Sequence, residues 1–169
     1  GGRGVSRHAT ISLPAANAIK LLILTGCRRG EVANMRFSQI KDDIWTIPET
    51  KNGRAHTVFI SPQARSVIEE QGQYANGDFV FESDRPKSDE IEPILVDSIT
   101  RALRRFISRC LADMEPFTVH DLRRSAATNW AERLDIEERV IELCLNHTPI
   151  NKLIRTYHRS RHTEKTRLV

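Results

Sequence analysis

The longest segments of the chain place apolar residues at helical spacing. In residues 13–25, the apolar residues Ile19, Leu22 and Ile23 fall on one side. Ser12 is a candidate N-cap and Gly26 is a stop signal. The same spacing, with start and stop signals, predicts further helices. They fall in residues 29–37, from Pro62 to about Gly72, around residues 99–111 with Pro116 as the end, from Thr118 with Asp121 in its capping-box position, from Asp135, and from Thr148-Pro149.

Two shorter segments alternate apolar and polar residues, as strands do. They are "DDIWTIPE" (residues 42–49) and "RAHTVFIS" (residues 54–61), and Asn52-Gly53 between them is a strong hairpin signal. We expect "NGDFVFES" (residues 76–83) to add a third short strand. The chain is therefore predicted to be α+β and mainly α, with a small antiparallel sheet of about three strands.

The length and composition fit one domain. The chain has 169 residues, of which 39% are hydrophobic, and this is enough to build a core. Its apolar runs are far shorter than the ~20 residues of a membrane span, and its N-terminus lacks the apolar centre of a signal peptide. Three widely spaced cysteines, Cys27, Cys110 and Cys144, favour a reducing compartment. We expect a cytoplasmic protein without a membrane partner.

Positive charge is concentrated near one end of the chain. The formal net charge is +4, but residues 151–169 alone carry six Lys and Arg residues against the single acid Glu164. Residues 82–92, "ESDRPKSDEIE", are net acidic. This asymmetry indicates a surface that faces a polyanion, with a solvated charged surface as an equal alternative.

The helix start in "TVHDLRRSAATNW" (residues 118–130) carries cations that the helix dipole disfavours. His120 and Arg123 are three residues apart, so they share a face beside the free N–H groups of the first turn. The two side chains can bind two oxygens of one phosphate there. Arg124 lies off this face and is expected to make a structural salt bridge or a DNA-backbone contact.

Three further motifs carry candidate reactive groups. "TGCRRGEV" places Arg28 where Glu31 can hold its guanidinium by a bidentate pair. Lys51 in "TKNGR" lies beside the hairpin turn and can reach a phosphate. His147 and, ten residues later, Tyr157 lie in "LCLNHTPINKLIRTYHRS", where arginines can stabilise a developing phenolate. Taken alone, the first motif also fits exposed arginines at a helical corner, and the second fits a solvated turn lysine.

Together these motifs resemble the catalytic domain of the tyrosine recombinase (phage integrase) family, most closely prophage and genomic-island integrases. The pattern is T-G-x-R-x-G-E, a hairpin lysine, H-x-L-R, a later histidine and a tyrosine ten residues beyond it, and it covers about residues 12–161. It implies that family's helical catalytic domain, with the small antiparallel sheet on one side. Residues 1–11 are expected to be an expression scar and linker, and residues 12–169 the C-terminal catalytic domain, with the N-terminal DNA-binding domains absent.

The resemblance implies a role for each residue that would touch the phosphate. Arg28 and Arg123 match the two arginines that clamp the scissile phosphate, and Glu31 matches the acid that supports the first arginine. His120 and His147 match the histidines that hydrogen-bond the phosphate. His120 is also a candidate acceptor of the tyrosine proton.

The resemblance also implies a reaction. Lys51 matches the hairpin lysine that protonates the leaving 5′-oxygen, and Tyr157 matches the nucleophile. Two transesterifications through a 3′-phosphotyrosyl link need no cofactor and no metal. The implied protein is a bacterial site-specific DNA recombinase that integrates or excises a mobile element. Its implied partners are a double-stranded DNA attachment site, further copies in a homotetramer, and accessory DNA-bending proteins. Asn146 departs from the family pattern, because glycine is frequent before the second histidine.

Three alternatives stay open. A non-cleaving DNA-binding or regulatory domain of the same fold would use the same arginines, but it needs no tyrosine at that spacing. A zinc module would use Cys144 and His147 with His158 and His162, although a basic tail is poorly suited to close a metal core. A type IB topoisomerase uses similar tyrosine chemistry, but "TGCRRGE" with "HDLRR" favours a recombinase.

Overall fold

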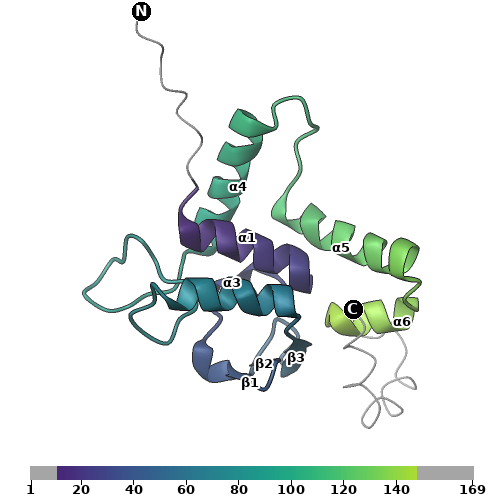
Figure 1. Ribbon diagram of the computed structural model, residues 1–169, viewed down its shortest axis with the longest axis horizontal. Coiled ribbons are helices and arrows are strands. Elements are labelled where there is room, and N and C mark those ends of the chain that lie inside the picture. Colours follow the sequence, from purple (N-terminus) through teal and green to yellow (C-terminus); the bar gives the residue numbers. More distant parts are fainter. Residues whose placement is uncertain (1–10, 148–169) are drawn as a thin grey trace, which may run out of the picture.

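The protein is an arrangement of helices around one central helix, with a small sheet on one side (Figure 1). The computed structural model describes residues 11–147. In Figure 1, α1 lies between α3, α4 and α5, and it packs against all three. Within this part of the chain no helix is long and apolar enough to cross a membrane. The elements in chain order are α1 (Leu13–Thr25), α2 (Arg29–Ala33), the 3₁₀ helix η1 (Phe37–Gln39), β1 (Ile40–Lys41), β2 (Ile44–Ile47), β3 (His56–Phe59), α3 (Pro62–Gly72), α4 (Val96–Cys110), α5 (Val119–Leu134) and α6 (Glu138–Cys144).

Helix α1 has clear sequence causes at both ends. Pro14 lies in its first turn, where the fixed φ suits a helix and the missing N–H is not needed. Ser12 is at the N-cap as predicted, but its side chain makes no capping hydrogen bond. Gly26 ends the helix in the left-handed conformation, with a φ of 63°. A Cβ at Gly26 would lie 2.7 Å from the ring of Trp130, so glycine also permits the close approach of α5.

The sheet is antiparallel and has the strand order β1-β2-β3. The predicted hairpin is confirmed, because β2 pairs with β3 and Trp45 lies opposite Val58. Gly53, in the turn between these strands, has a φ of 65°, which explains the Asn-Gly signal. The prediction of a mainly helical α+β fold with a three-stranded antiparallel sheet is confirmed.

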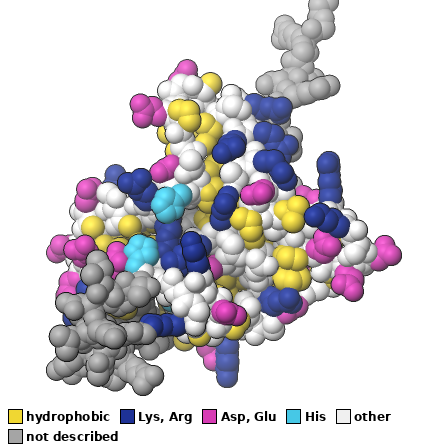
Figure 2. Space-filling view, turned by 180° about the vertical axis from the view of Figure 1, so that it is seen from behind, with side chains coloured by type: hydrophobic (Ala, Val, Ile, Leu, Met, Phe, Trp, Pro, Cys, Tyr) yellow, Lys and Arg dark blue, Asp and Glu magenta, His cyan; other side chains and the backbone are white. Residues whose placement is uncertain are grey.

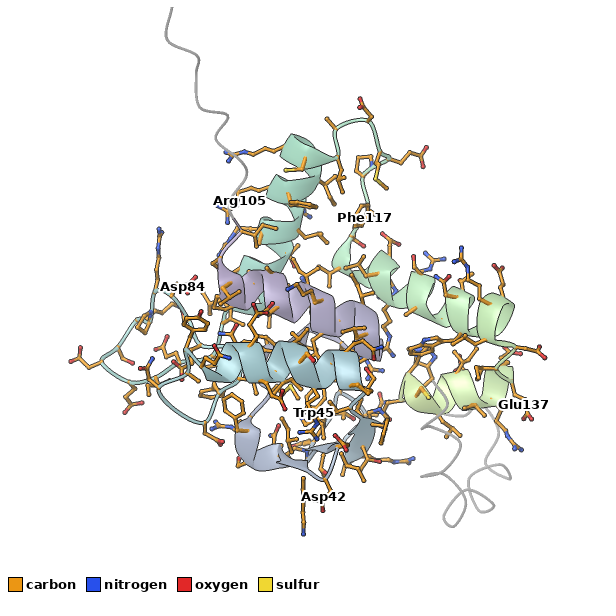
Figure 3. The ribbon with its side chains drawn as sticks, in the orientation of Figure 1. Asp42, Trp45, Asp84, Arg105, Phe117 and Glu137 are labelled. Carbon is orange, nitrogen blue, oxygen red and sulfur yellow. The ribbon has the colours of Figure 1, made fainter. Side chains whose placement is uncertain are left out.

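The third strand, however, is not where the sequence predicted it. It is β1, whereas the expected strand at residues 76–83 contributes only isolated bridges, from Phe79 and Glu82. Asp42 and Asp43, expected at the start of a strand, both have positive φ and turn the chain from β1 into β2. Aspartate tolerates this conformation, so a turn was hidden in a segment interpreted as strand. Figure 3 shows Asp42 at the outer end of this turn, away from the helices.

Three predicted helix boundaries are wrong, and the first is the end of α2, which lies at Ala33 and not at Phe37. Helix α4 ends at Cys110, so the chain leaves the helix before it reaches Pro116. Asp135 does not begin a helix but ends α5 in the left-handed conformation, with a φ of 51°. A short polar side chain suits a helix start and a left-handed helix end alike, so the sequence signal was ambiguous. The helix predicted from Thr148-Pro149 lies outside the described residues.

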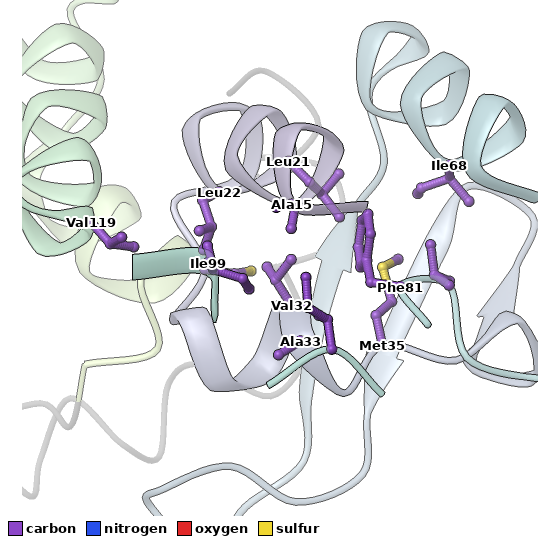
Figure 4. Packing of buried hydrophobic residues seen from close by; sticks show 14 of the residues in the cluster. Ala15, Leu21, Leu22, Val32, Ala33, Met35, Ile68, Phe81, Ile99 and Val119 are labelled. Atoms are coloured by element: carbon purple, nitrogen blue, oxygen red, sulfur yellow. The ribbon is translucent and has the colours of Figure 1, made fainter. Parts of the chain in front are cut away.

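The main core lies beneath α1 and joins it to the sheet, α2, α3 and α4 (Figure 4). Its largest fully buried apolar side chains are Trp45, Phe81, Leu21, Leu22, Met35 and Ile99. A second, smaller cluster of Ala126, Trp130, Ile141 and Leu145 joins α5 to α6. The two clusters hold the ends of α1, α5 and α6 close together.

Candidate active site

Six of the side chains that the sequence predicts for the site line one open cleft. Its volume is about 1090 Å³, and it lies between the start of α2, the β2–β3 hairpin, α4, the start of α5 and the residues after α6. Figure 2 shows two histidines beside a group of Lys and Arg side chains on one face of the molecule. Tyr157 lies outside the described residues. The predicted site residues that line the cleft are Arg28, Glu31, Lys51, His120, Arg123 and His147.

Arg28 is held at the start of α2 by the acid predicted to support it. Its Nη1 lies 3.0 Å from Glu31 Oε1, and its Nη2 donates to the carbonyl oxygen of Asn146 at 3.3 Å. The sequence predicted that both oxygens of Glu31 bind the guanidinium, but only one of them does. The second oxygen accepts the backbone N–H of Arg28 at 2.8 Å, because Arg28 is the N-cap of α2. The next residue, Arg29, instead contacts Thr100 on α4.

Arg123 is anchored inside the cleft by two backbone carbonyls. The residue is only 7% exposed, and it projects from α5. Its Nη1 donates to the carbonyl oxygen of Gly26, and its Nη2 donates to that of Leu145. A guanidinium carries five N–H groups, so others stay available for an anion.

Arg28 is close enough to Arg123 to affect the pKa of that guanidinium. Burial lowers the pKa of Arg123, and the positive charge of Arg28 lowers it further. The guanidinium still keeps its proton at neutral pH. Glu31 opposes the shift only in part, so two like charges remain close together in the cleft. An anion bound between them would relieve the repulsion, and this makes the cleft suited to a phosphate group.

His120 lies exposed on the first turn of α5, at the cleft. Thr118 and Asp121 set this turn by the predicted capping box: Asp121 N–H donates to Thr118 Oγ1 at 3.3 Å, and Thr118 N–H donates to Asp121 Oδ2 at 2.9 Å. The hydrogen bonds from Thr118 hold the pKa of Asp121 below its usual value. Arg124 is not among the residues that line the cleft, and it forms an ion pair with Asp121 at 3.8 Å.

Lys51 reaches the cleft from the tip of the β2–β3 hairpin. Its side chain is exposed, and its ammonium has no hydrogen-bond or ion-pair partner within residues 11–147. An ammonium without a competing carboxylate keeps all its N–H groups available as donors.

His147 is oriented by an acid that the sequence did not reveal. Its Nδ1 lies 2.8 Å from Glu142 Oε2, and its backbone N–H donates to the Glu142 carbonyl oxygen at 2.9 Å. When Nδ1 carries the hydrogen of this contact, Nε2 is the nitrogen left for a ligand.

Sequence reasoning also missed residues that hold or extend the cleft. Glu142 is five residues from His147, a separation at which side chains of a regular helix do not face each other. Asn146 gave a usable signal, since it replaces the glycine expected there, and its φ of 51° explains why glycine is frequent at that position. Arg104 on α4 lines the cleft with no motif around it.

The zinc alternative finds little support in the chemistry around Cys144. Burial raises the pKa of this thiol to about 11, which disfavours the thiolate that zinc binds. His158 and His162 lie outside the described residues. Across residues 11–147, three or more His, Cys, Asp or Glu side chains are nowhere grouped to hold a metal ion.

Sequence comparison gives a match along almost the whole chain. The model of the phage integrase family matches residues 5–164. The chain is also similar to the prophage integrase IntF of Escherichia coli (strain K12), with 28% identity over 148 residues, which cover 83% of this chain and 30% of that protein. The chain therefore spans less than a third of this relative.

Structure comparison gives the same fold. A crystal structure of a lambda integrase (75–356) dimer bound to a COC′ core site matches with a TM-score of 0.66 and 19% identity, over 82% of this chain and 51% of that one. A lambda integrase tetramer bound to a Holliday junction matches with a TM-score of 0.62 and 19% identity, over 82% of this chain and 42% of that one. At this identity the likeness establishes the fold alone.

Proposed function

The chain belongs to the phage integrase family, the tyrosine recombinases, and on this premise we propose that it is the catalytic domain of a site-specific DNA recombinase. The protein cleaves and rejoins DNA through a 3′-phosphotyrosyl intermediate, and so integrates or excises a mobile element. The observation that carries this proposal is the cleft in which Arg28 lies near enough to lower the pKa of Arg123, with His120, His147 and Lys51 around it.

In the proposed reaction the two guanidinium groups bind the non-bridging oxygens of the scissile phosphate. Arg28 is oriented by Glu31, and Arg123 by two backbone carbonyls, so both groups are in place before DNA binds. Negative charge grows on these oxygens as phosphorus becomes five-coordinate, and pre-oriented cations stabilise that state. His120 and His147 add hydrogen bonds to the same oxygens.

Tyr157 supplies the nucleophile in this proposal. Its phenol oxygen attacks phosphorus, and the new P–O bond forms as the bond to the 5′-oxygen breaks. His120 is the candidate acceptor of the phenol proton, and Lys51 gives a proton to the departing 5′-oxygen. In the second step a 5′-hydroxyl of the partner strand attacks the phosphotyrosyl link and releases the phenol. The number of phosphoester bonds is unchanged, so the exchange needs no external energy source.

The proposed partners are a double-stranded DNA attachment site and further copies of the protein in a homotetramer. The lambda integrase structures support this, because one is bound to a core site and another is a tetramer bound to a Holliday junction. The chain spans 30% of one relative and 51% of one of these structures, so strand exchange is assigned to the full-length protein. Accessory DNA-bending proteins and a place on bacterial DNA remain predictions.

A covalent adduct tests this proposal. The full-length protein is incubated with nicked duplexes tiled across the DNA that flanks its gene, since the cleavage site is not known. A nick close to the cleavage point lets the short 5′-hydroxyl strand diffuse away and traps the link. We expect an adduct on denaturing gels with the wild-type protein and none with Tyr157→Phe. Tight binding of a duplex without any adduct would favour the non-cleaving regulatory domain instead.

Arg123→Lys and Arg124→Lys are a matched pair in the same assay. Lysine keeps the charge but lacks the planar fork that reaches two carbonyls and a phosphate together. We expect Arg123→Lys to slow adduct formation by about 100-fold, as the loss of one transition-state donor does elsewhere. Arg124→Lys should stay within about twofold of wild type, because its ion pair is exposed. Equal losses in the two variants would contradict the role given to Arg123.

A further inference from the structure

Asn146, the residue before His147, contacts the hairpin on both sides of Lys51. Its carbonyl oxygen accepts a hydrogen bond from Asn52 Nδ2 at 2.8 Å. Its own Nδ2 donates to Thr50 Oγ1 at 2.9 Å. Thr50 and Asn52 directly precede and follow Lys51, so one residue anchors both neighbours of the hairpin lysine.

The anchor at Thr50 is part of the turn itself. Thr50 is 6% exposed, and its Oγ1 donates to the carbonyl oxygen of Arg54 at 2.9 Å. Its backbone N–H donates to the same oxygen at 3.1 Å, while Gly53 N–H donates to the Thr50 carbonyl oxygen at 2.8 Å. A hydroxyl has one hydrogen, and here Arg54 receives it, so Oγ1 can only accept from Asn146. The amide of Asn146 meets that requirement.

The same turn reaches the phosphate clamp. The carbonyl oxygen of Asn146 also accepts from Arg28 Nη2 at 3.3 Å, and the preceding carbonyl, of Leu145, accepts from Arg123. The hairpin is therefore fixed relative to both guanidinium groups through two consecutive backbone residues. Lys51 has no partner of its own within residues 11–147, so its place depends on its neighbours.

We propose that Asn146 is a positioning residue that holds Lys51 where it protonates the leaving 5′-oxygen. The inference rests on the proposed function of the cleft. The amide of Asn146 acts through Thr50, and its carbonyl acts through Asn52. A φ of 51° at this position would suit glycine equally well, but glycine would remove the donor to Thr50. The asparagine therefore adds a contact that glycine, frequent at this position in the family, does not make.

Asn146→Gly tests this role cleanly, because it keeps a backbone that tolerates positive φ and removes only the amide. The full-length variant is assayed on the nicked duplex that wild type cleaves, and on the same duplex with sulfur in place of the scissile 5′-oxygen. A thiol has a pKa of about 8.5 and leaves as a thiolate, so the sulfur duplex needs no proton donor. We expect cleavage of the oxygen duplex to slow by about tenfold, part of what general acid catalysis contributes. The sulfur duplex should be cleaved at the wild-type rate.

Thr50→Val and Thr50→Ser provide the matched controls. Valine removes the bonds of the hydroxyl to both Asn146 and Arg54, so it should slow cleavage of the oxygen duplex at least as much as Asn146→Gly does. Serine keeps the hydroxyl and should retain the wild-type rate. The double variant Asn146→Gly/Thr50→Val should be no slower than Thr50→Val alone, since the valine has already removed the acceptor of the Asn146 amide. Lys51→Ala should show the same dependence on the leaving atom, with a loss of about 100-fold or more on the oxygen duplex.

Two results would overturn the role of Asn146: equal slowing of Asn146→Gly on both duplexes, or an unchanged rate on the oxygen duplex. A wild-type protein that forms no adduct on either duplex would overturn the proposed function, and this inference with it. The two failures are therefore distinguishable in one experiment.

Discussion

At the residue scale, three glycines differ in backbone conformation and in the space around them. Gly26 has a φ of 63°, and an added Cβ would meet the Trp130 ring at 2.7 Å. Gly53 has nearly the same φ, 65°, but has open space around it. Gly30, within α2, has neither constraint. Alanine at each position should therefore have a different effect on stability.

We expect Gly26→Ala to lower the free energy of unfolding by about 2–4 kcal/mol, from left-handed strain and overpacking together. Gly53→Ala should cost about 1–2 kcal/mol through strain alone. Gly30→Ala should be neutral or stabilising by about 0.5–1 kcal/mol, because alanine is the better helix former. Urea unfolding measures all three. Equal losses for Gly26→Ala and Gly53→Ala would contradict the close contact with Trp130.

His56 makes stability depend on pH. Its Nε2 lies 3.2 Å from the carbonyl oxygen of Cys144, which joins β3 to the end of α6. Burial lowers the pKa of His56 below the ordinary value of 6.5. At a pH just below 6.5, His56 therefore binds a proton in the unfolded chain but not in the folded chain. The stability that the fold has with a neutral His56 is therefore fully present at neutral pH and is lost as the pH falls below about 6.5.

We expect the free energy of unfolding to fall as the pH is lowered from about 7.5 to about 5.5, with His56 adding a slope of at most about 1.4 kcal/mol per pH unit. In His56→Gln this part of the slope should vanish, so the variant should lose less stability on acidification than wild type. Urea unfolding at several pH values measures the difference. Identical slopes in the two proteins would mean that His56 is not held neutral by the fold.

At the scale of elements, α1 and α5 both start after a hydroxyl residue, but only one of the two hydroxyls caps its helix. Thr118 accepts from Asp121 N–H, whereas Ser12 makes no such bond. We expect Thr118→Ala to lower the free energy of unfolding by about 1 kcal/mol, and Ser12→Ala by less than about 0.5 kcal/mol. Thermal or urea unfolding checks the pair. A larger loss for Ser12→Ala would show that the cap assignment is reversed.

Most elements could be predicted because their causes are local. Pro62 with Ser61 starts α3, Gly26 ends α1, and Asn52-Gly53 makes the hairpin, each through the conformational preference of the residues themselves. The error at Asp135 arose because one residue type serves two purposes: aspartate suits both a helix start and a left-handed helix end. The error at Asp43 arose because apolar alternation extended the expected strand over a turn residue with positive φ.

The site was predictable only as far as its motifs reach. Arg28, Lys51 and His147 carry local patterns, and the structure brings them into one cleft. The bonds of Asn146 could not be predicted, because its partners Arg28 and Asn52 lie 118 and 94 residues away in the sequence. No local pattern encodes such a pair, and only the packing of α6 against the rest of the fold creates it.

At the scale of the whole molecule, the cleft exists only when the complete fold has formed. Among the described residues it draws on α2, the hairpin, α4, α5 and His147. The main core holds α2, the sheet and α4 in place. The smaller cluster of α5 and α6 contains Leu145, whose carbonyl oxygen accepts from Arg123. Loss of either cluster should therefore disturb the clamp before any reacting group is changed.

Mass spectrometry of the trapped adduct shows which residue carries the covalent link to DNA. The adduct of the full-length protein is digested with nuclease and protease, and the modified peptide is sequenced. The proposed reaction predicts a deoxynucleoside 3′-phosphate on the phenol oxygen of Tyr157. Attachment at any other residue, or through a 5′-phosphate, would contradict it.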